Sequence, residues 1–163
     1  MKDPRTPERV TFTVRPLTLD LWPALEDLFG KGGASNGCWC MYWRLGPEYH
    51  KRPREKNRRA LRSLVRRGPP PGLLAFDGER PVGWCQLTPR DDLDWLNRKA
   101  AFERVDTLPV WSISCFYVRR GYRGKGVMGR HNAQRHELLL GPGAGVELDR
   151  QVHQLEEDHA CEQ

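Results

Sequence analysis

Near the start of the chain, the apolar positions first alternate and then take a helical spacing. A strand is predicted over Val10–Arg15, where every second residue is apolar. Asp20 is placed to cap a helix after this strand, and one side of that helix is apolar: Leu21, Leu25 and Leu28. The glycines of Gly30–Gly33 end the helix. The aromatic stretch Asn36–Trp43 has no repeating pattern and is assigned to no element.

The middle of the chain predicts a long helix and then a hairpin. Pro53 is placed to open a helix over Arg54–Arg67, whose apolar stripe is Ala60, Leu61, Leu64 and Val65. Leu73–Phe76 predicts a short strand, and the dipeptide Asp77-Gly78 is a strong hairpin signal. Pro81–Leu87 is therefore predicted to pair antiparallel with that short strand.

A polar connector, Pro89–Pro109, separates the hairpin from a third apolar segment and contains a short helix predicted around Trp95–Phe102. Val110–Val118 is nearly all apolar or small, which is typical of a central strand buried on both faces. The sequence therefore predicts a single α+β domain over residues 1–163, with a central, mostly antiparallel sheet flanked by helices.

The composition fits one compact domain. The chain has 163 residues, of which 38% are hydrophobic and 29% are charged, and no apolar run approaches the roughly 20 residues of a membrane helix. The N-terminus leads into no apolar signal region. The five cysteines are an odd number, which argues against a disulfide framework, and the pair Cys38 and Cys40 lacks the further ligands that a structural zinc site needs. We expect a cytoplasmic protein without a metal ion or a membrane partner.

Positive charge is concentrated in one segment. The net charge is +6, and Arg44–Arg67 holds ten Lys or Arg residues against two Glu. Such a segment suits nucleic acid, the phosphates of a cofactor or an acidic substrate, but it is equally well the solvated face of a helix. Because no recognised nucleic-acid-binding motif accompanies it, nucleic acid is the weaker alternative.

The predicted strand Val110–Val118 runs directly into a glycine-rich turn, Arg119–Val127. Glycines let a backbone turn tightly, and the N–H groups at a following helix start then point at an anion. The pattern favours a phosphate site, although other phosphate loops compete. The Walker pattern has no match, and the dinucleotide fingerprint matches literally at Gly124, Gly126 and Gly129 but follows strands predicted to be antiparallel.

The segment Tyr122-Arg123-Gly124-Lys125-Gly126-Val127 resembles the pyrophosphate signature R/Q-x-x-G-x-G/A of the GNAT family of acyl-CoA-dependent N-acyltransferases, carried here on Arg123, Gly126 and Met128. Phe116-Tyr117-Val118 is similar to the strand whose backbone pairs with the pantetheine arm. The order of elements also matches the family over roughly residues 11–129, and residues 38–43 and 70–75 resemble a bacterial subgroup of it. The resemblance implies acetyl-CoA (acyl-CoA) as co-substrate, an amine as acceptor, and these contact residues: Phe116, Val118, Arg123, Gly124, Lys125, Gly126, Val127, Met128 and Gly129.

Two features depart from the family. Met128 lies at a position where the family has Gly or Ala. Its larger side chain would crowd the pyrophosphate unless Gly129 takes over the role of the small residue. All fifteen aromatic residues lie at or before Tyr122, so no later Tyr can protonate the departing thiolate as it often does in the family. We expect residues 130–163 to be an atypical tail from a shifted reading frame or a degenerate C-terminus, without the family's last strands and with little transferase turnover. A divergent tail that completes the fold is the alternative.

No catalytic side chain can be assigned from the sequence. The backbone amides of Phe116 and Val118 are candidates to bind the oxyanion of the thioester, whereas Glu79 is interpreted as a turn residue. The aromatic residues Trp39, Tyr42 and Trp43 either line an acceptor pocket or belong to the core. The expected function is transfer of an acetyl or other acyl group to a small-molecule or peptide amine. A non-catalytic protein that binds acyl-CoA, or nucleic acid through the basic helix 54–67, is the alternative, and a homodimer is left open.

Overall fold

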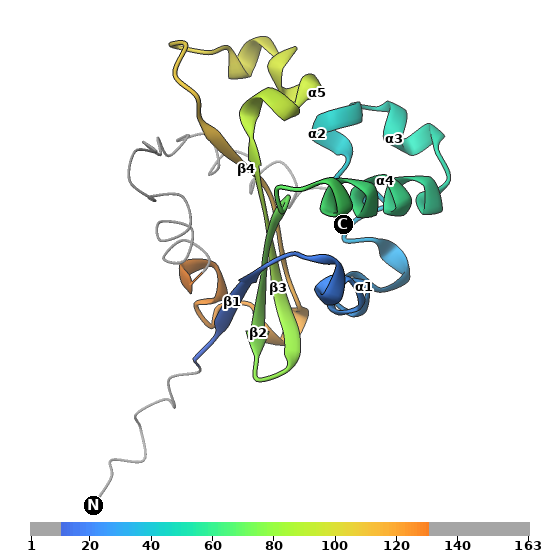
Figure 1. Ribbon diagram of the computed structural model, residues 1–163, viewed down its shortest axis with the longest axis vertical. Coiled ribbons are helices and arrows are strands. Elements are labelled where there is room, and N and C mark those ends of the chain that lie inside the picture. The colour runs from blue at the N-terminus through green and yellow to red at the C-terminus, as the bar shows by residue number, and fades with distance from the viewer. Residues whose placement is uncertain (1–10, 131–163) are drawn as a thin grey trace, which may run out of the picture.

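The computed structural model of the protein describes residues 11–130, which form one mixed sheet-and-helix unit (Figure 1). In chain order its strands and helices are β1 (Thr13–Pro16), α1 (Trp22–Phe29), α2 (Tyr42–Leu45), α3 (Glu48–Lys51), α4 (Arg54–Arg67), β2 (Gly72–Asp77), β3 (Arg80–Pro89), α5 (Asp94–Asn97) and β4 (Trp111–Val118). The expectations for the tail, including the missing strands, lie outside the described residues.

The four described strands form one antiparallel sheet in the order β1-β2-β3-β4. The hairpin predicted at Asp77-Gly78 is confirmed: Asp77 pairs with Arg80, so Gly78 and Glu79 form the turn. Gly78 has a φ of 58°, which a two-residue hairpin turn requires and which glycine adopts without strain. The exposed Glu79 is a turn residue, as interpreted from the sequence. The α+β class is confirmed.

The prediction that Val110–Val118 is buried on both faces is wrong for the described part of the sheet. The strand begins at Trp111 as β4 and lies at the end of the described strand order, beyond β3. Its residues from Cys115 to Val118 are only half-buried. The doubly buried strand is β3, because it is paired on both sides and every residue from Pro81 to Thr88 is buried.

The helices agree with the apolar pattern more closely than with the predicted caps. Helix α4 spans Arg54–Arg67, as predicted, and Leu61 and Val65 of its stripe are buried. Asp20 does not cap α1, because it lies inside a 3-10 turn that precedes the helix, and its carboxylate accepts a hydrogen bond from Thr18. The helix predicted around Trp95–Phe102 is interrupted and forms α5 and a separate 3-10 turn. None of the helices within residues 11–130 has the length and apolar character to cross a membrane.

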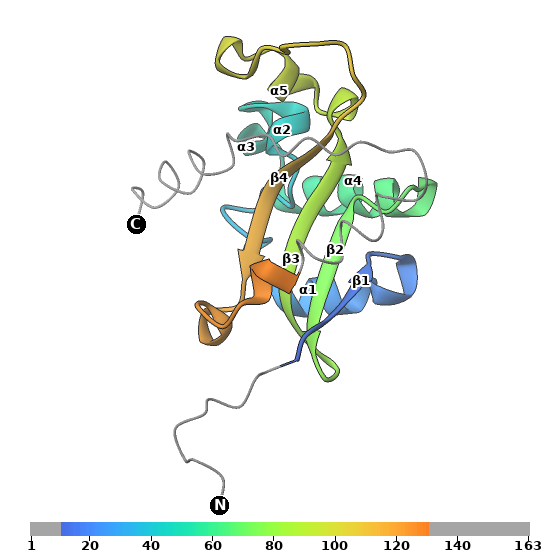
Figure 2. The same cartoon turned by 90° about the vertical axis from the view of Figure 1, so that its left-hand side faces the viewer.

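Helices cover one face of the sheet, and the glycine-rich turn closes part of the other (Figures 1 and 2). On the helical face, Leu74 and Trp84 of the sheet pack with Leu25 of α1 and Leu61 of α4, and all of these side chains are 2% exposed or less. On the opposite face lie Leu73, Cys85, Leu87 and Ile113 in one cluster. A second cluster there contains Phe12, Ala75, Val82 and Val127, so the residue that starts the helix after the turn is part of the core.

The aromatic stretch 36–43 is an irregular loop that crosses the helical face. Trp39 and Cys40 have φ values of 46° and 58°, a left-handed conformation that costs energy in residues other than glycine. A buried side chain of α4 holds this loop: Asn57 Nδ2 donates to Gly37 O at 3.0 Å and to Tyr49 O at 3.1 Å. Asn57 is thus the polar centre of an interface that the apolar stripe alone did not predict.

We predict that Asn57→Ala lowers the free energy of unfolding by about 2–4 kcal/mol, because two buried carbonyl groups lose their donors. Chemical denaturation followed by tryptophan fluorescence measures this difference. Lys56→Ala is the matched control, since Lys56 lies next to Asn57 on α4 but is exposed, and it should change stability by less than about 0.5 kcal/mol. Equal stability of the two variants would show that Asn57 does not hold the loop.

Candidate functional site

The outer edge of β4 presents backbone groups in the arrangement that an extended ligand could pair with. Arg119 N donates to Val82 O at 2.9 Å, and Tyr117 lies opposite Trp84 in the ladder. Alternate residues of an antiparallel strand direct their N–H and C=O groups to opposite sides. Phe116 and Val118 therefore direct theirs away from β3, toward the other edge of β4.

A β-bulge interrupts the pairing of β4 just before these residues. Cys115 pairs with Gln86 and Ile113 pairs with Leu87, so the intervening Ser114 has no partner in the register. Trp43 fixes the bulge, because its buried indole Nε1 donates to Ser114 O at 3.0 Å. Bulges bend a strand and redirect its backbone groups, and they are common beside active sites. The Ser114 hydroxyl is buried and has no hydrogen-bond partner among the described residues.

The glycine-rich turn follows β4 directly. Gly124 and Gly126 have φ values of 73° and 82°, so a side chain at either position would be strained, although a Cβ there would meet no other heavy atom of residues 11–130 within 4 Å. The helix of residues 127–130 starts immediately afterwards, and its first turn-closing bond runs from Arg130 N to Gly126 O at 3.2 Å. The amides of residues 127–129 precede that bond, and amides in this position point out of the helix start.

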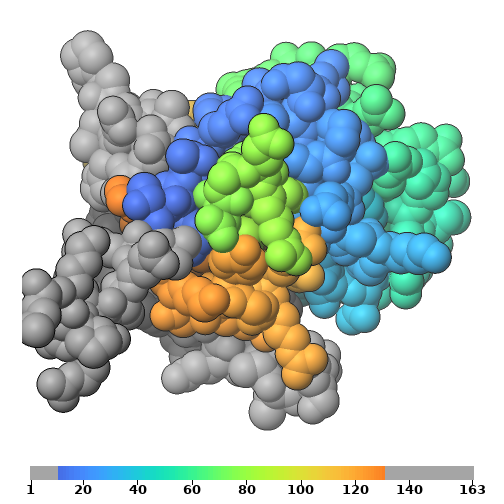
Figure 3. All heavy atoms as spheres, turned by 90° about the horizontal axis from the view of Figure 1, so that it is seen from below, coloured from blue at the N-terminus to red at the C-terminus, as the bar shows by residue number. Residues whose placement is uncertain are grey.

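Contacts with β2, β3, α1 and the residue before β1 fix the position of this turn against the sheet. Tyr122 donates its hydroxyl to Asp77 Oδ2 at 2.9 Å and packs edge-on against Phe12 at 6.3 Å between ring centroids. Val127 is 2% exposed in the core. Arg119 donates to Pro81 O at 3.1 Å and to Asp27 Oδ2 at 2.7 Å. Seen from below, the turn lies beside the β2–β3 hairpin (Figure 3). The sequence did not indicate that Tyr122 holds the turn, because a single tyrosine in a glycine-rich segment forms no recognisable pattern.

The structure brings the predicted cofactor residues into one continuous path. The path runs along the edge of β4 at Phe116 and Val118 and continues into the exposed turn, where the side chains of Arg123 and Lys125 lie near the glycines. Lys125 Nζ lies 5.2 Å from the centre of the Tyr122 ring. Met128 is half-buried whereas Gly129 is exposed. The backbone of this path could therefore meet a diphosphate with the glycines rather than with the Met128 side chain.

A match to a family model decides the assignment. The model of the acetyltransferase (GNAT) family matches residues 37–130, more than half of the chain. The chain belongs to the GNAT family. Acetyltransferases of this family transfer an acyl group from acyl-CoA to an amine, so the expected enzyme class is confirmed. The matched segment begins in the aromatic loop and ends at the glycine turn, and it contains the whole path described above.

Solved structures agree with this GNAT assignment at the level of the fold. The aminoglycoside acetyltransferase AAC(6')-Iy, solved with a bisubstrate analog of CoA and acetylneamine, matches with a TM-score of 0.53 at 12% identity, over 92% of this chain and 88% of that chain. A possible acetyltransferase from Clostridium difficile 630 matches with a TM-score of 0.52 at 11% identity, over 91% of this chain and 87% of that one. A search of curated protein sequences finds no match.

Two cysteines near the β4 bulge are in contact. Cys40 Sγ lies 3.5 Å from Cys115 Sγ and accepts a hydrogen bond from Trp84 Nε1 at 3.1 Å. The hydrogen bond to Cys115, together with burial, raises the pKa of Cys40 well above its ordinary value, and the same bond lowers the pKa of Cys115. Cys40 and Cys85 are buried, whereas Cys115 is only half-buried. No group of three or more potential metal ligands occurs within residues 11–130.

The aromatic residues belong mainly to the core rather than to one pocket. Trp39 is 4% exposed and stacks on Trp22 with ring centroids 5.9 Å apart. Trp43 packs in a different cluster, against Leu93 and Leu96. One edge of Trp39 also lines an open cleft of about 330 Å³ between α1 and α4. The interpretation as core is therefore confirmed for Trp39 and Trp43, whereas Tyr42 is half-buried and packs against the cluster of Trp43. Trp43 has a further role at the bulge.

Several charges of helix α4 are used within the GNAT domain. Arg58 pairs with Glu26 of α1 and, at 2.8 Å, with Glu55 of its own helix. The guanidinium of Arg62 lies 5.9 Å from the centre of the Trp22 ring. These contacts orient part of the basic face toward α1 rather than toward a partner. The alternative function, nucleic-acid binding through residues 54–67, is therefore supported only by the remaining exposed basic residues of α4.

We predict that the protein binds duplex DNA weakly and without sequence preference. Its affinity should fall with salt at a logarithmic slope of about −0.9 for each phosphate neutralised, and the double variant Arg66→Gln and Arg67→Gln should make the slope shallower by about 2. Fluorescence anisotropy of a labelled duplex across a salt series measures both quantities. A sequence-specific complex that persists at about 0.15 M salt would contradict the prediction and favour a nucleic-acid function.

Proposed function

We propose that residues 116–129 bind acetyl-CoA, or a related acyl-CoA, and that the acyl group is delivered at the β4 bulge to a small-molecule or peptide amine. One observation carries the proposal: the outward backbone groups of Phe116 and Val118 lead into the left-handed turn at Gly124 and Gly126 and then into a helix start. The pantetheine arm contains amides that can pair with a strand edge. The glycine turn can accommodate the diphosphate, because the space beside the α-carbons of Gly124 and Gly126 is open among residues 11–130.

Each residue proposed for the cofactor site has a separate task. Phe116 and Val118 pair with the pantetheine through backbone groups and are the candidate amide donors for the thioester oxyanion. Gly124, Gly126 and Gly129 allow close approach of the backbone, and Val127 anchors the helix start in the core. Arg123 and Lys125 supply positive charge beside the diphosphate. Met128 is half-buried, so its backbone amide rather than its side chain faces the ligand.

The acceptor must lose a proton before it reacts. An amine with a pKa near 10.4 is about 0.04% neutral at pH 7, which is equivalent to about 4.6 kcal/mol. Its lone pair then forms the bond to the thioester carbon, the carbon–sulfur bond breaks, and the departing thiolate takes up a proton. We assign no side chain within residues 11–130 to either proton transfer. The amides on β4 contribute by binding the negative charge that develops on the carbonyl oxygen.

We predict that Gly126→Glu abolishes acetyl-CoA binding in titration calorimetry, because a carboxylate would occupy the diphosphate site and the residue has a positive φ. Two controls separate charge from backbone strain. Gly126→Ala introduces strain without charge and should weaken binding less. Gly32→Glu introduces the same charge at an exposed glycine that lacks a positive φ and lies outside residues 116–129, and it should bind nearly as wild type. Unchanged affinity of Gly126→Glu would reject the cofactor site.

The expected low turnover of this chain stays a prediction, because it rests on residues 130–163. A thiol-release assay with acetyl-CoA and a panel of small amines measures it, with acetyl-CoA binding determined on the same sample. We expect binding with little or no release of CoA. Release well above the rate of amine-free hydrolysis, combined with strong hydrogen-exchange protection across Val146–Leu155, would instead favour a divergent tail that completes the fold.

A further inference from the structure

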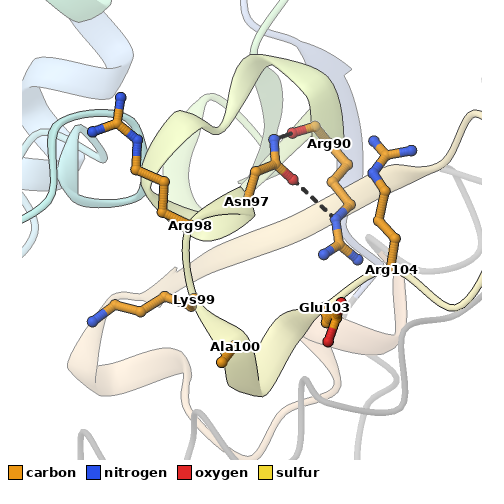
Figure 4. A pocket seen from close by; sticks show the side chains of 7 residues that line it. All are labelled: Arg90, Asn97, Arg98, Lys99, Ala100, Glu103 and Arg104. Carbon is orange, nitrogen blue, oxygen red and sulfur yellow. Dashed lines mark hydrogen bonds between the residues drawn. The ribbon is translucent and has the colours of Figure 1, made fainter.

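The connector between β3 and β4 forms a cationic cleft at the end of the sheet remote from the glycine turn (Figures 1 and 4). The cleft has a volume of about 420 Å³ and is lined by Arg90, Asn97, Arg98, Lys99, Ala100, Glu103 and Arg104. Four of these residues are cations and one is an acid. The charge of the lining therefore favours an anionic ligand.

Arg90 is a buried cation at the wall of this cleft, bonded to neutral groups. Arg90 is only 8% exposed. Its guanidinium donates to two neutral acceptors, Asn97 Oδ1 at 3.2 Å and the carbonyl oxygen of Phe102. Asn97 is itself held by its Nδ2 bond to Arg90 O at 3.0 Å. Within residues 11–130 no carboxylate forms an ion pair with Arg90, although a buried charge is costly unless it is paired.

The other cations of the lining differ in how far they are neutralised. Arg104 pairs with Asp91, and Lys99 Nζ lies 4.4 Å from the centre of the Trp95 ring. Arg98 is exposed, but its side chain and that of Lys99 point away from Arg90 (Figure 4). Arg90 is thus the cation at the wall of the cleft that no carboxylate of residues 11–130 pairs with, and its guanidinium is the group that a ligand would meet. A planar guanidinium matches a carboxylate especially well, because two N–H groups can bind both oxygens.

The cleft is physically connected to the β4 bulge. Arg90 N donates to Val110 O at 2.9 Å, which joins the cleft to the residue before β4. The ring of Phe102 packs edge-on against Trp43 at 5.6 Å between centroids, and Trp43 holds Ser114. At about 3.3 Å per residue, Val110 lies about 13 Å from Ser114 along the strand. The cleft therefore lies within reach of an elongated molecule whose other end is at the bulge.

We infer that this cleft binds a carboxylate of the acceptor, so that the enzyme acts on amines that also carry a carboxylate at a distance of about 13 Å, such as short peptides with a free C-terminus. The inference rests on the proposed acyl transfer at the bulge, and it names the class of acceptor for that site. The amine would lie at the bulge, and the carboxylate would bind to the guanidinium of Arg90.

Direct binding is tested on the full chain with succinate as the probe and the uncharged succinamide as its matched control. NMR titration of the arginine Nε–H resonances should show saturable binding of succinate and none of succinamide. Arg90→Gln should weaken succinate binding about tenfold, which is the loss of one charge-assisted contact. Glu103→Gln should strengthen succinate binding, because it removes the acid of the lining. Arg66→Gln removes the same charge from exposed α4 and should have no effect.

Equal titration by succinate and succinamide, or an equal effect of Arg66→Gln and Arg90→Gln, would overturn the inference. Arg90→Gln removes the buried cation but also two hydrogen bonds that hold the connector, so thermal unfolding is measured beside it. The exposed variant Glu103→Gln keeps the test decisive if Arg90→Gln does not fold, because unchanged succinate binding in Glu103→Gln would overturn the inference.

A second arm separates this inference from the proposed function. Tetraglycine and tetraglycinamide, which span about 13 Å when extended, are compared as acceptors in the thiol-release assay, and acetyl-CoA binding is measured independently. A preference of about tenfold for the free acid, lost in Arg90→Gln, supports the inference. Acetyl-CoA binding with equal use of acid and amide would reject the carboxylate site but leave the proposed function intact. Absence of acetyl-CoA binding would reject the proposed function, and the succinate titration would then still decide whether the cleft is an anion site.

Discussion

The pairing of β4 with β3 is the constraint on which the functional geometry depends. β3 is buried along its length and paired on both sides, so it fixes the position and direction of β4. The register then determines which backbone groups of β4 face outward, at Phe116 and Val118, and where the strand enters the glycine turn. A slip of one residue would turn the outward amides inward and move each side chain to the other face. The bulge at Ser114 absorbs one extra residue and preserves the register on both sides of it.

Side chains from distant parts of the chain reinforce this register at both ends of β4. At the far end, Arg119 joins the hairpin to α1, and Tyr122 joins the turn to Asp77. At the bulge, the indole of Trp43 donates to the backbone of β4. Trp43 belongs to α2, whose approach to the sheet depends on the left-handed residues Trp39 and Cys40. The strain of that loop is compensated by burial and by hydrogen bonds such as those of Asn57.

Elements whose ends are marked by proline or glycine, or whose apolar residues repeat regularly, could be predicted from the sequence alone. Helix α4 was predicted with its bounds, because Pro53 and Gly68 mark its ends and its leucines repeat with a helical period. The hairpin and the glycine turn were predicted for the same reason, since Gly78, Gly124 and Gly126 adopt conformations that other residues avoid. Asp20 shows the limit of such signals, because a 3-10 turn before α1 placed it inside a turn rather than at the helix cap.

Features set by contacts between distant residues could not be predicted in this way. The burial of β4 depends on which strands pair with it, and its apolar composition did not distinguish an end position from a central one. Trp43 gains its role from Ser114, which lies 71 residues away in the sequence, and Arg90 gains its role from the fold of the connector to which it belongs. The proposed cofactor path could be predicted from the sequence because it is continuous in the chain. The proposed acceptor side is assembled from separate segments, and only the structure brings those together.

A cationic acceptor side also bears on how the amine becomes neutral. A positive charge disfavours protonation of a nearby amine and lowers its pKa. At an effective dielectric constant of 20, a cation about 13 Å away contributes about 1.3 kcal/mol, and salt reduces this value severalfold in an open cleft because the Debye length is about 8 Å. Deprotonation at pH 7 requires about 1.0–1.4 kcal/mol for the α-amine of a peptide and about 4.6 kcal/mol for a lysine-like amine. The screened contribution of the cleft is smaller than either requirement. A base or an ordered chain of water molecules at the bulge must supply the larger part, so the cleft selects and orients the acceptor and assists its deprotonation only secondarily.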